Sequence, residues 1–206
     1  MHVTSSEKGE GKSTIAVNIA IAFAHAGGKV LLIDADLRAP SLHRIFGLPN
    51  TLGLTNFLAG KEAPSDISQP TAVTGLFAIM SGPLPPNPVE LLSSAKMLDL
   101  MNLAKERFDH VILDGPPVIG LADAVVLAKV AQGTIFVVDA GRTRYGALEG
   151  SVKRLRATNA KIIGAVIDRF GRAGTGYGYG HGYKYDYHYT YDYGDRSEVA
   201  ELQEKA

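Results

Sequence analysis

The 206-residue sequence contains no cysteine. The chain can therefore form neither a disulfide framework, nor a thiolate zinc site, nor an iron–sulfur cluster. An excess of charge of either sign is also missing, because 21 basic side chains balance 21 acidic ones. Such a balance argues against a general polyanion-binding surface, and we expect no nucleic acid among the partners.

Long apolar runs are absent as well. No run approaches the roughly 18 residues that a membrane-spanning helix needs, and the longest, 15–26, is interrupted by Asn18 and His25. The N-terminus also lacks the charged region, apolar core and small-residue cleavage site of a secretory signal. These absences predict a cytoplasmic chain. The start, Met1-His2-Val3, is abrupt for a strand that leads into a glycine-rich loop, so we expect the sequence to begin inside a longer protein.

Residues 1 to about 170 alternate short runs rich in Val and Ile with helical patterns. This alternation predicts a doubly wound, mostly parallel α/β sheet with crossover helices. The runs are apolar on both faces, as strands covered on both sides must be. Strands are expected at His2–Ser5, Val30–Ile33, Phe77–Met80, His110–Leu113, Thr134–Val138 and Ile162–Ile167. Helices are expected at about Ser13–Ala26, Lys96–Arg107, Leu121–Ala128 and Tyr145–Ala157, with a proline-rich loop at 81–88 and a short helix through Glu90-Leu91-Leu92.

The composition changes abruptly after Gly171. The stretch that follows is dominated by glycine and tyrosine and lacks the aliphatic residues of a core, which predicts a flexible tail. We therefore divide the chain into a P-loop domain, 1–170, and a tail, 171–206, that ends in a charged segment. Eight of the nine tyrosines lie in the tail: Tyr177, Tyr179, Tyr183, Tyr185, Tyr187, Tyr189, Tyr191 and Tyr193.

Residues 6–14, Ser-Glu-Lys-Gly-Glu-Gly-Lys-Ser-Thr, match the Walker A pattern except that Ser6 stands at the first glycine position. Gly9 and Gly11 allow the backbone to curl and aim its N–H groups at phosphate oxygens, and the following helix adds its positive end. Lys12 is expected to reach the β- and γ-phosphates and Ser13 to bind Mg²⁺. A ligand-free turn is the alternative, but the loop lies between a β-type run and an apolar helix. The expected nucleotide contacts are Glu7, Lys8, Gly9, Glu10, Gly11, Lys12, Ser13 and Thr14, with ATP and Mg²⁺ as cofactors.

Three aspartates follow predicted strands. Asp34 and Asp36 end the run after Lys29, and Asp114 ends a Walker B run, Val-Ile-Leu-Asp. Ligands of open parallel sheets bind outside the carboxyl ends of the strands, so all three should converge on the loop. Asp114 is expected to take part in Mg²⁺ binding, while Asp34 and Asp36 share the roles of metal organisation and general base. Arg38, which is also among the expected nucleotide contacts, fits either a bridge to a phosphate or carboxylate or a surface ion pair.

The tyrosine run allows three interpretations. It is either an inert low-complexity tail, a surface that stacks on single-stranded nucleic acid, or a cluster of phosphate acceptors. From 171 to 206 there are four basic and six acidic side chains, a net charge of about −2, which repels phosphate groups. Exposed tyrosines on a flexible segment can enter an active site without unfolding anything. Joined to a P-loop, the third interpretation is favoured.

The chain resembles the kinase domain of bacterial tyrosine kinases that accompany capsule and exopolysaccharide export. The resemblance spans about Val3 to Tyr193 and rests on several runs beyond the P-loop. These are residues 34–40 (Asp-Ala-Asp-Leu-Arg-Ala-Pro), Gly53-Leu54, Leu58-Ala59-Gly60, residues 86–92 (Pro-Asn-Pro-Val-Glu-Leu-Leu), Phe108-Asp109, residues 113–117 (Leu-Asp-Gly-Pro-Pro), Asp123-Ala124 and the tyrosine cluster.

The resemblance implies a deviant-Walker P-loop fold and an ATP-dependent protein-tyrosine autokinase that regulates polysaccharide polymerisation and export. It implies that Lys12 binds phosphates, Ser13 binds Mg²⁺, and Asp34 or Asp36 deprotonates the incoming tyrosine. It also implies a ring of neighbouring subunits, in which one tail enters the next site. A membrane-anchored polysaccharide co-polymerase, fused or separate, is the expected activator and would hold the kinase at the inner face of the plasma membrane.

Three features depart from the family pattern. The acidic–basic helix that precedes the first strand and helps to close the ring is not in this sequence. Asp168 stands where relatives commonly have Asn near the adenine, and Lys8 matches a lysine that contacts phosphate across a dimer in partitioning ATPases. Two other functions remain as alternatives: a partitioning-type ATPase, and a non-catalytic nucleotide-binding regulator of an export complex.

Overall fold

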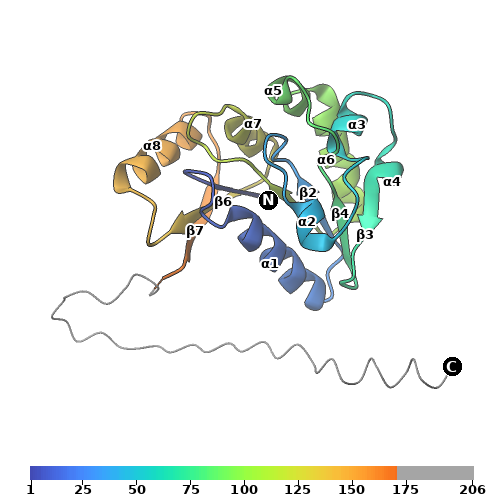
Figure 1. Cartoon of the computed structure of the whole chain (residues 1–206), viewed down its shortest axis with the longest axis horizontal. Coiled ribbons are helices and arrows are strands. Elements are labelled where there is room, and N and C mark those ends of the chain that lie inside the picture. The colour runs from blue at the N-terminus through green and yellow to red at the C-terminus, as the bar shows by residue number, and fades with distance from the viewer. Residues whose placement is uncertain (171–206) are drawn as a thin grey trace, which may run out of the picture. The chain divides into compact units, whose positions relative to one another are not determined.

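The computed structural model describes residues 1–170, which form a seven-stranded sheet with helices packed on its faces (Figure 1). The strand order is β3-β4-β2-β5-β1-β6-β7. Neighbouring strands are parallel except for the edge pair β3 and β4, so the predicted doubly wound, mostly parallel sheet is confirmed. The strands are β1 (His2–Ser5), β2 (Val30–Asp34), β3 (Ser68–Pro70), β4 (Leu76–Ile79), β5 (His110–Asp114), β6 (Thr134–Asp139) and β7 (Ile162–Asp168).

Eight helices connect these strands within the described residues. The long ones are α1 (Lys12–His25), α6 (Ala95–Arg107), α7 (Asp123–Val130) and α8 (Tyr145–Arg156). Four are a single short turn or little more: α2 (Leu42–Phe46), α3 (Leu54–Leu58), α4 (Pro64–Ile67) and α5 (Pro88–Leu92).

Each side of the sheet has its own apolar core. Alternate residues of a strand point to opposite faces, so Val30 and Leu32 of β2 pack on the α1 side, while Leu31 and Ile33 pack on the α6 side. A third cluster around Phe136 joins β6 to α7 and α8. Burial on both faces explains why the central strands are continuous apolar runs.

All six predicted strands are present, with ends that differ by at most one residue at each side. The prediction missed β3 and the short helices α2, α3 and α4. These elements are three to five residues long, too short to show a period of 2 or 3.6. The strand β3 is also polar, with proline at its end, because it pairs only on one side at the sheet edge.

The predicted tail lies outside the described residues, and the division of the chain at residue 170 stays a prediction. Within residues 1–170, no helix combines the length and the apolar character that crossing a membrane requires.

Candidate nucleotide and phosphoryl-transfer site

Five neighbouring parallel strands, in the spatial order β2-β5-β1-β6-β7, bring their carboxyl ends to one edge of the sheet. Asp34, Asp114, Asp139 and Asp168 end four of these strands, and the phosphate loop follows the central one, β1. The predicted convergence of Asp34 and Asp114 on the loop therefore follows directly from the strand order. This edge is also where open α/β sheets bind their ligands.

The phosphate loop has the backbone that its glycines predict. Gly9 and Gly11 have φ angles of 85° and 89°, a left-handed conformation that side chains disfavour. A Cβ at Gly11 would collide with the Asp168 carboxylate, and one at Gly9 would lie 2.9 Å from Arg142 Nη1. The helix α1 begins at Lys12, so its unpaired N–H groups face the loop interior.

Lys12 is paired with one of the predicted aspartates. Its Nζ lies 3.3 Å from Asp36 Oδ2, and both side chains are buried. The other oxygen of Asp36 accepts a hydrogen bond of 3.0 Å from the Ala39 N–H. The ion pair therefore holds the Lys12 ammonium group beside the phosphate loop, where a bound phosphate group can replace Asp36 as its partner.

Asp34 and Asp114 lie side by side, because they are register partners on β2 and β5. Asp34 Oδ2 accepts 3.0 Å hydrogen bonds from the N–H groups of Ser41 and Leu42, which places it at the start of α2. Its Oδ1 and both oxygens of Asp114 are buried and have no partner among the described residues. Buried carboxylate oxygens without partners need a cation or water.

The electrostatics of the pair fit a cation site. Burial raises the pKa of Asp34 to about 6, against the backbone N–H groups of Leu42 and Ser41. Burial also raises the pKa of Asp114 to about 8, reinforced by the charge of Asp34 and opposed by the Ser13 hydroxyl and Lys12. In the described residues no group of three or more acidic or histidine side chains forms a complete metal cage. Mg²⁺ commonly takes its remaining ligands from water and substrate phosphates, so the Ser13 hydroxyl and the Asp114 carboxylate fit it.

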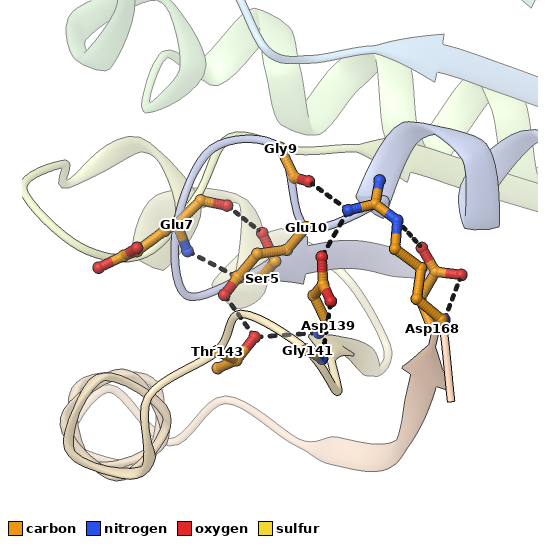
Figure 2. A network of polar contacts seen from close by, with 9 residues as sticks. Ser5, Glu7, Gly9, Glu10, Asp139, Gly141, Thr143 and Asp168 are labelled. Carbon is orange, nitrogen blue, oxygen red and sulfur yellow. Dashed lines mark hydrogen bonds and ion pairs between the residues drawn. The ribbon is translucent and has the colours of Figure 1, made fainter. Parts of the chain in front are cut away.

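The Glu10 carboxylate holds the phosphate loop in place through two hydrogen bonds. Its Oε2 accepts a 2.7 Å hydrogen bond from the Glu7 N–H, and its Oε1 accepts one of 2.5 Å from the Thr143 hydroxyl (Figure 2). The same hydroxyl accepts a bond from the Asp139 N–H. The Glu10 side chain is thus fully buried and points away from the ligand side, which leaves its backbone N–H as the group that can meet a phosphate.

A second tie joins the loop to the end of β7. Arg169 Nη1 lies 2.5 Å from Asp139 Oδ2 and 3.5 Å from the Gly9 carbonyl oxygen. Arg169 adopts a left-handed φ of 57° to reach both. Sequence reasoning missed Asp139, Thr143 and Arg169, although Asp139 ends a strand in the same way as Asp114. The position of Asp139 directly after the predicted strand Thr134–Val138 was the signal by which it could have been found.

The other predicted contacts are distributed around this site. Ser13 is half-buried in the first turn of α1, and the neighbouring Thr14 is exposed. Glu7 and Lys8 are exposed on the loop. Arg38 Nε lies 3.3 Å from both carboxylate oxygens of the buried Asp123, and the expected contact of Arg38 with nucleotide stays a prediction. The eight predicted acceptor tyrosines lie outside the described residues.

The fold and the loop define a P-loop nucleotide-binding domain. Residues 2–177 match the family described as the CobQ/CobB/MinD/ParA nucleotide binding domain, to which the chain belongs. Within that class, the chain is 43% identical over 166 residues to the tyrosine-protein kinase YwqD of Bacillus subtilis, covering 81% of this chain and 70% of the relative. It is 36% identical to the putative tyrosine-protein kinase CapB of Staphylococcus aureus, over 81% of this chain and 73% of the relative.

A solved structure gives the same result. The kinase domain of the Escherichia coli tyrosine kinase ETK superposes with a TM-score of 0.81 at 33% identity, covering 88% of this chain and 72% of that one. The chain therefore belongs to the bacterial tyrosine-protein kinases, as the resemblance of its motifs predicts.

Proposed function

We propose that the chain is an ATP- and Mg²⁺-dependent tyrosine autokinase that phosphorylates its own C-terminal tyrosine cluster, in trans within an oligomer. The observation that carries this proposal is the convergence of Lys12 with Asp34, Asp36 and Asp114 beside a phosphate loop. The sequence supplies eight tyrosines on the same chain as this site. Kinase relatives at 36–43% identity support the same reaction.

The Ser13 hydroxyl, Asp114 and Asp36 would hold the Mg²⁺ ion. When bound, the ion offsets the negative charge of the phosphates and helps to orient them. The orphaned oxygens of Asp114 are the structural support for this assignment.

In the proposed reaction, the tyrosine Oη attacks the γ-phosphorus of ATP. The bond between that phosphorus and the β–γ bridging oxygen breaks, ADP leaves with the bond electrons, and the phenolic proton passes to an aspartate. Lys12 and the loop N–H groups stabilise the charge on the transferred phosphoryl group.

Asp34 and Asp36 are both candidates for the base, and they differ in how their oxygens are engaged. Both oxygens of Asp36 have a contact, one with Lys12 and the other with the Ala39 N–H, and a phosphate that pairs with Lys12 would release the first. Asp34 keeps Oδ1 without a partner among the described residues. Burial raises the pKa of Asp34 to about 6, which favours proton uptake relative to an exposed carboxylate.

The physiological role that we propose is regulation of capsule or exopolysaccharide polymerisation and export. A membrane-anchored co-polymerase, fused or separate, would activate the kinase and hold it at the inner face of the membrane. The partners are then neighbouring copies of the chain and this activator.

The test is incubation of the purified chain with Mg²⁺-ATP, followed by intact mass measurement and phosphosite mapping. We expect increments of single phosphates confined to Tyr177–Tyr193. Lys12→Met should abolish them, and Asp34→Asn should lower the rate by about 100-fold or more, which is the usual contribution of a general base. Asp36→Asn serves as the matched comparison for the assignment of the base, since it should weaken nucleotide and Mg²⁺ binding as well.

The alternatives give different results in the same assay. ATP turnover without phosphotyrosine, even after addition of a cognate activating segment, would indicate a partitioning-type ATPase. Nucleotide binding without any phosphoryl transfer would indicate a non-catalytic regulator.

A further inference from the structure

A basic groove lies beside the phosphate loop. It has a volume of about 470 Å³ and is formed by the loop, the segment after β2 and the segment after β4. Its basic side chains are Lys8, Arg44 and His43, and its apolar ones include Pro40, Pro83 and Leu84. None of the groove-lining residues, all of which belong to the described part of the chain, is acidic.

The walls of the groove are tied to each other. The Asn50 side-chain amide donates to the Gly82 carbonyl at 3.1 Å, and its oxygen accepts the Gly82 N–H at 2.9 Å. The Ser81 hydroxyl donates to the same Asn50 oxygen at 3.1 Å. Arg44 Nη2 donates to the Pro40 carbonyl at 3.3 Å, which holds its guanidinium over one wall. The groove is therefore formed before any occupant arrives, which lowers the entropic cost of binding.

One wall of the groove contacts two of the candidate catalytic aspartates, which are buried behind it and do not line it. The segment that forms one wall donates its Ala39 N–H to Asp36 and its Leu42 N–H to Asp34, both at 3.0 Å. A peptide that lies along this wall is therefore separated from these carboxylates by the segment 39–42, whose backbone contacts both.

We infer that this groove binds the substrate segment of a second copy of the chain and selects tyrosines that have an acidic neighbour. The inference rests on the proposed kinase function. The sequence contains two such sites, Tyr185-Asp186-Tyr187 and Tyr191-Asp192-Tyr193. One tyrosine of such a segment enters the catalytic centre, and the adjacent aspartate then forms an ion pair with Arg44. The second ring packs on Pro83 and on Leu84, which is 64% exposed in the described structure.

The test compares two enzymes on two substrates. The enzymes are the full chain and its Arg44→Glu variant; the substrates are the full Lys12→Met chain with and without Asp186→Asn and Asp192→Asn. At low salt we expect Arg44→Glu to raise the KM for the acidic substrate about tenfold, because attraction becomes repulsion. The kcat and the KM for ATP should stay within about twofold. The Asn-substituted substrate should have a raised KM that Arg44→Glu changes little.

Two controls keep the inference falsifiable. Arg107→Glu reverses the charge of an exposed arginine that ends α6 just before β5 begins and does not line the groove, so it should leave the phosphorylation of both substrates unchanged. A Lys12→Met substrate that carries Asp186→Arg and Asp192→Arg should recover the affinity lost by Arg44→Glu. Equal loss on both original substrates, or loss on neither, would overturn the inference.

A binding measurement separates the failure of the groove from the failure of the kinase. If the wild-type pair forms no phosphotyrosine, the proposed function fails, and the groove is then tested with a labelled peptide that copies residues 183–193. Fluorescence anisotropy should show the full chain binding this peptide about tenfold more tightly than Arg44→Glu does. Equal binding, or displacement of the peptide by ADP, would contradict a peptide groove, and the latter would assign the surface to nucleotide.

Discussion

The His2 imidazole occupies a fully buried position on β1. Its Nδ1 lies 3.5 Å from the Thr134 hydroxyl, and its Nε2 has no hydrogen-bond partner among the described residues. Gly115 packs against this ring so closely that a Cβ there would collide with it. Burial, reinforced by the positive charge of the amino terminus, lowers the pKa of His2 to about 3.

This burial predicts a stability loss in acid. The unfolded chain takes up a proton at His2 below about pH 6.5, whereas the folded chain does so only near pH 3, so stability falls as pH falls between these values. The contribution amounts to about 2 kcal/mol between pH 7 and pH 5. Urea unfolding of wild type and His2→Gln at both pH values should show a smaller loss in the variant. His25→Gln, at an exposed position, is the control, and parallel losses in wild type and His2→Gln would contradict the prediction.

The ends of β6 and β7 are joined by an ion pair that also reaches the phosphate loop. Asp139 is buried, while the Arg169 side chain is 46% exposed, so solvent screens part of the attraction. The Gly9 carbonyl shares the same guanidinium. The Arg169 guanidinium therefore joins the ends of β6 and β7 to the phosphate loop.

A double-mutant cycle measures this coupling. We expect Arg169→Gln to lower the free energy of unfolding by about 1–2 kcal/mol, because it leaves the Asp139 carboxylate buried without its cation. Asp139→Asn in the same background should recover part of the loss, giving a coupling energy above about 0.5 kcal/mol. Chemical denaturation supplies all four values. Additive effects of the two changes would show that the contact contributes nothing, and Arg156→Gln on exposed α8 gives the background of a lost surface charge.

Charge also acts on the molecule as a whole. The sequence is neutral, with 21 positive and 21 negative side chains, and the eight tyrosines of the tail add no charge until they are modified. Each phosphotyrosine carries about −1.5 to −2 charges at neutral pH. Complete modification would therefore change the net charge by roughly −12 to −16, which is large for a chain of this size.

We expect this charge to loosen any oligomer of the kinase. Neighbouring tails repel each other once they are phosphorylated, so the fully modified chain should elute later, at a smaller apparent size, in size-exclusion chromatography. High salt should reduce the difference because it screens the repulsion. A chain with all eight tail tyrosines replaced by phenylalanine is the control. Identical elution before and after phosphorylation, at matched protein concentration, would count against this role of the tail.

Local sequence patterns predict much of the fold and of the candidate site. Apolar runs of strand length, the glycines of residues 9–11 and the aspartates that follow two of the runs are short-range signals. They predicted the class of fold, the phosphate loop and the edge of the sheet at which the aspartates meet. Local signals succeed here because burial on both faces requires apolar strands, and because only glycine tolerates the backbone of the loop.

Other features depend on contacts between residues far apart in the chain. The hydrogen bond from Thr143 to Glu10 joins positions 133 residues apart, and the Arg38–Asp123 pair spans 85 residues. The adjacency of Asp34 and Asp114 follows from the placement of β5 between β2 and β1, which no local period contains. Local sequence patterns thus identify the side chains of the site. The order of the strands decides which of these side chains lie next to each other, and that order depends on how the elements are connected and packed.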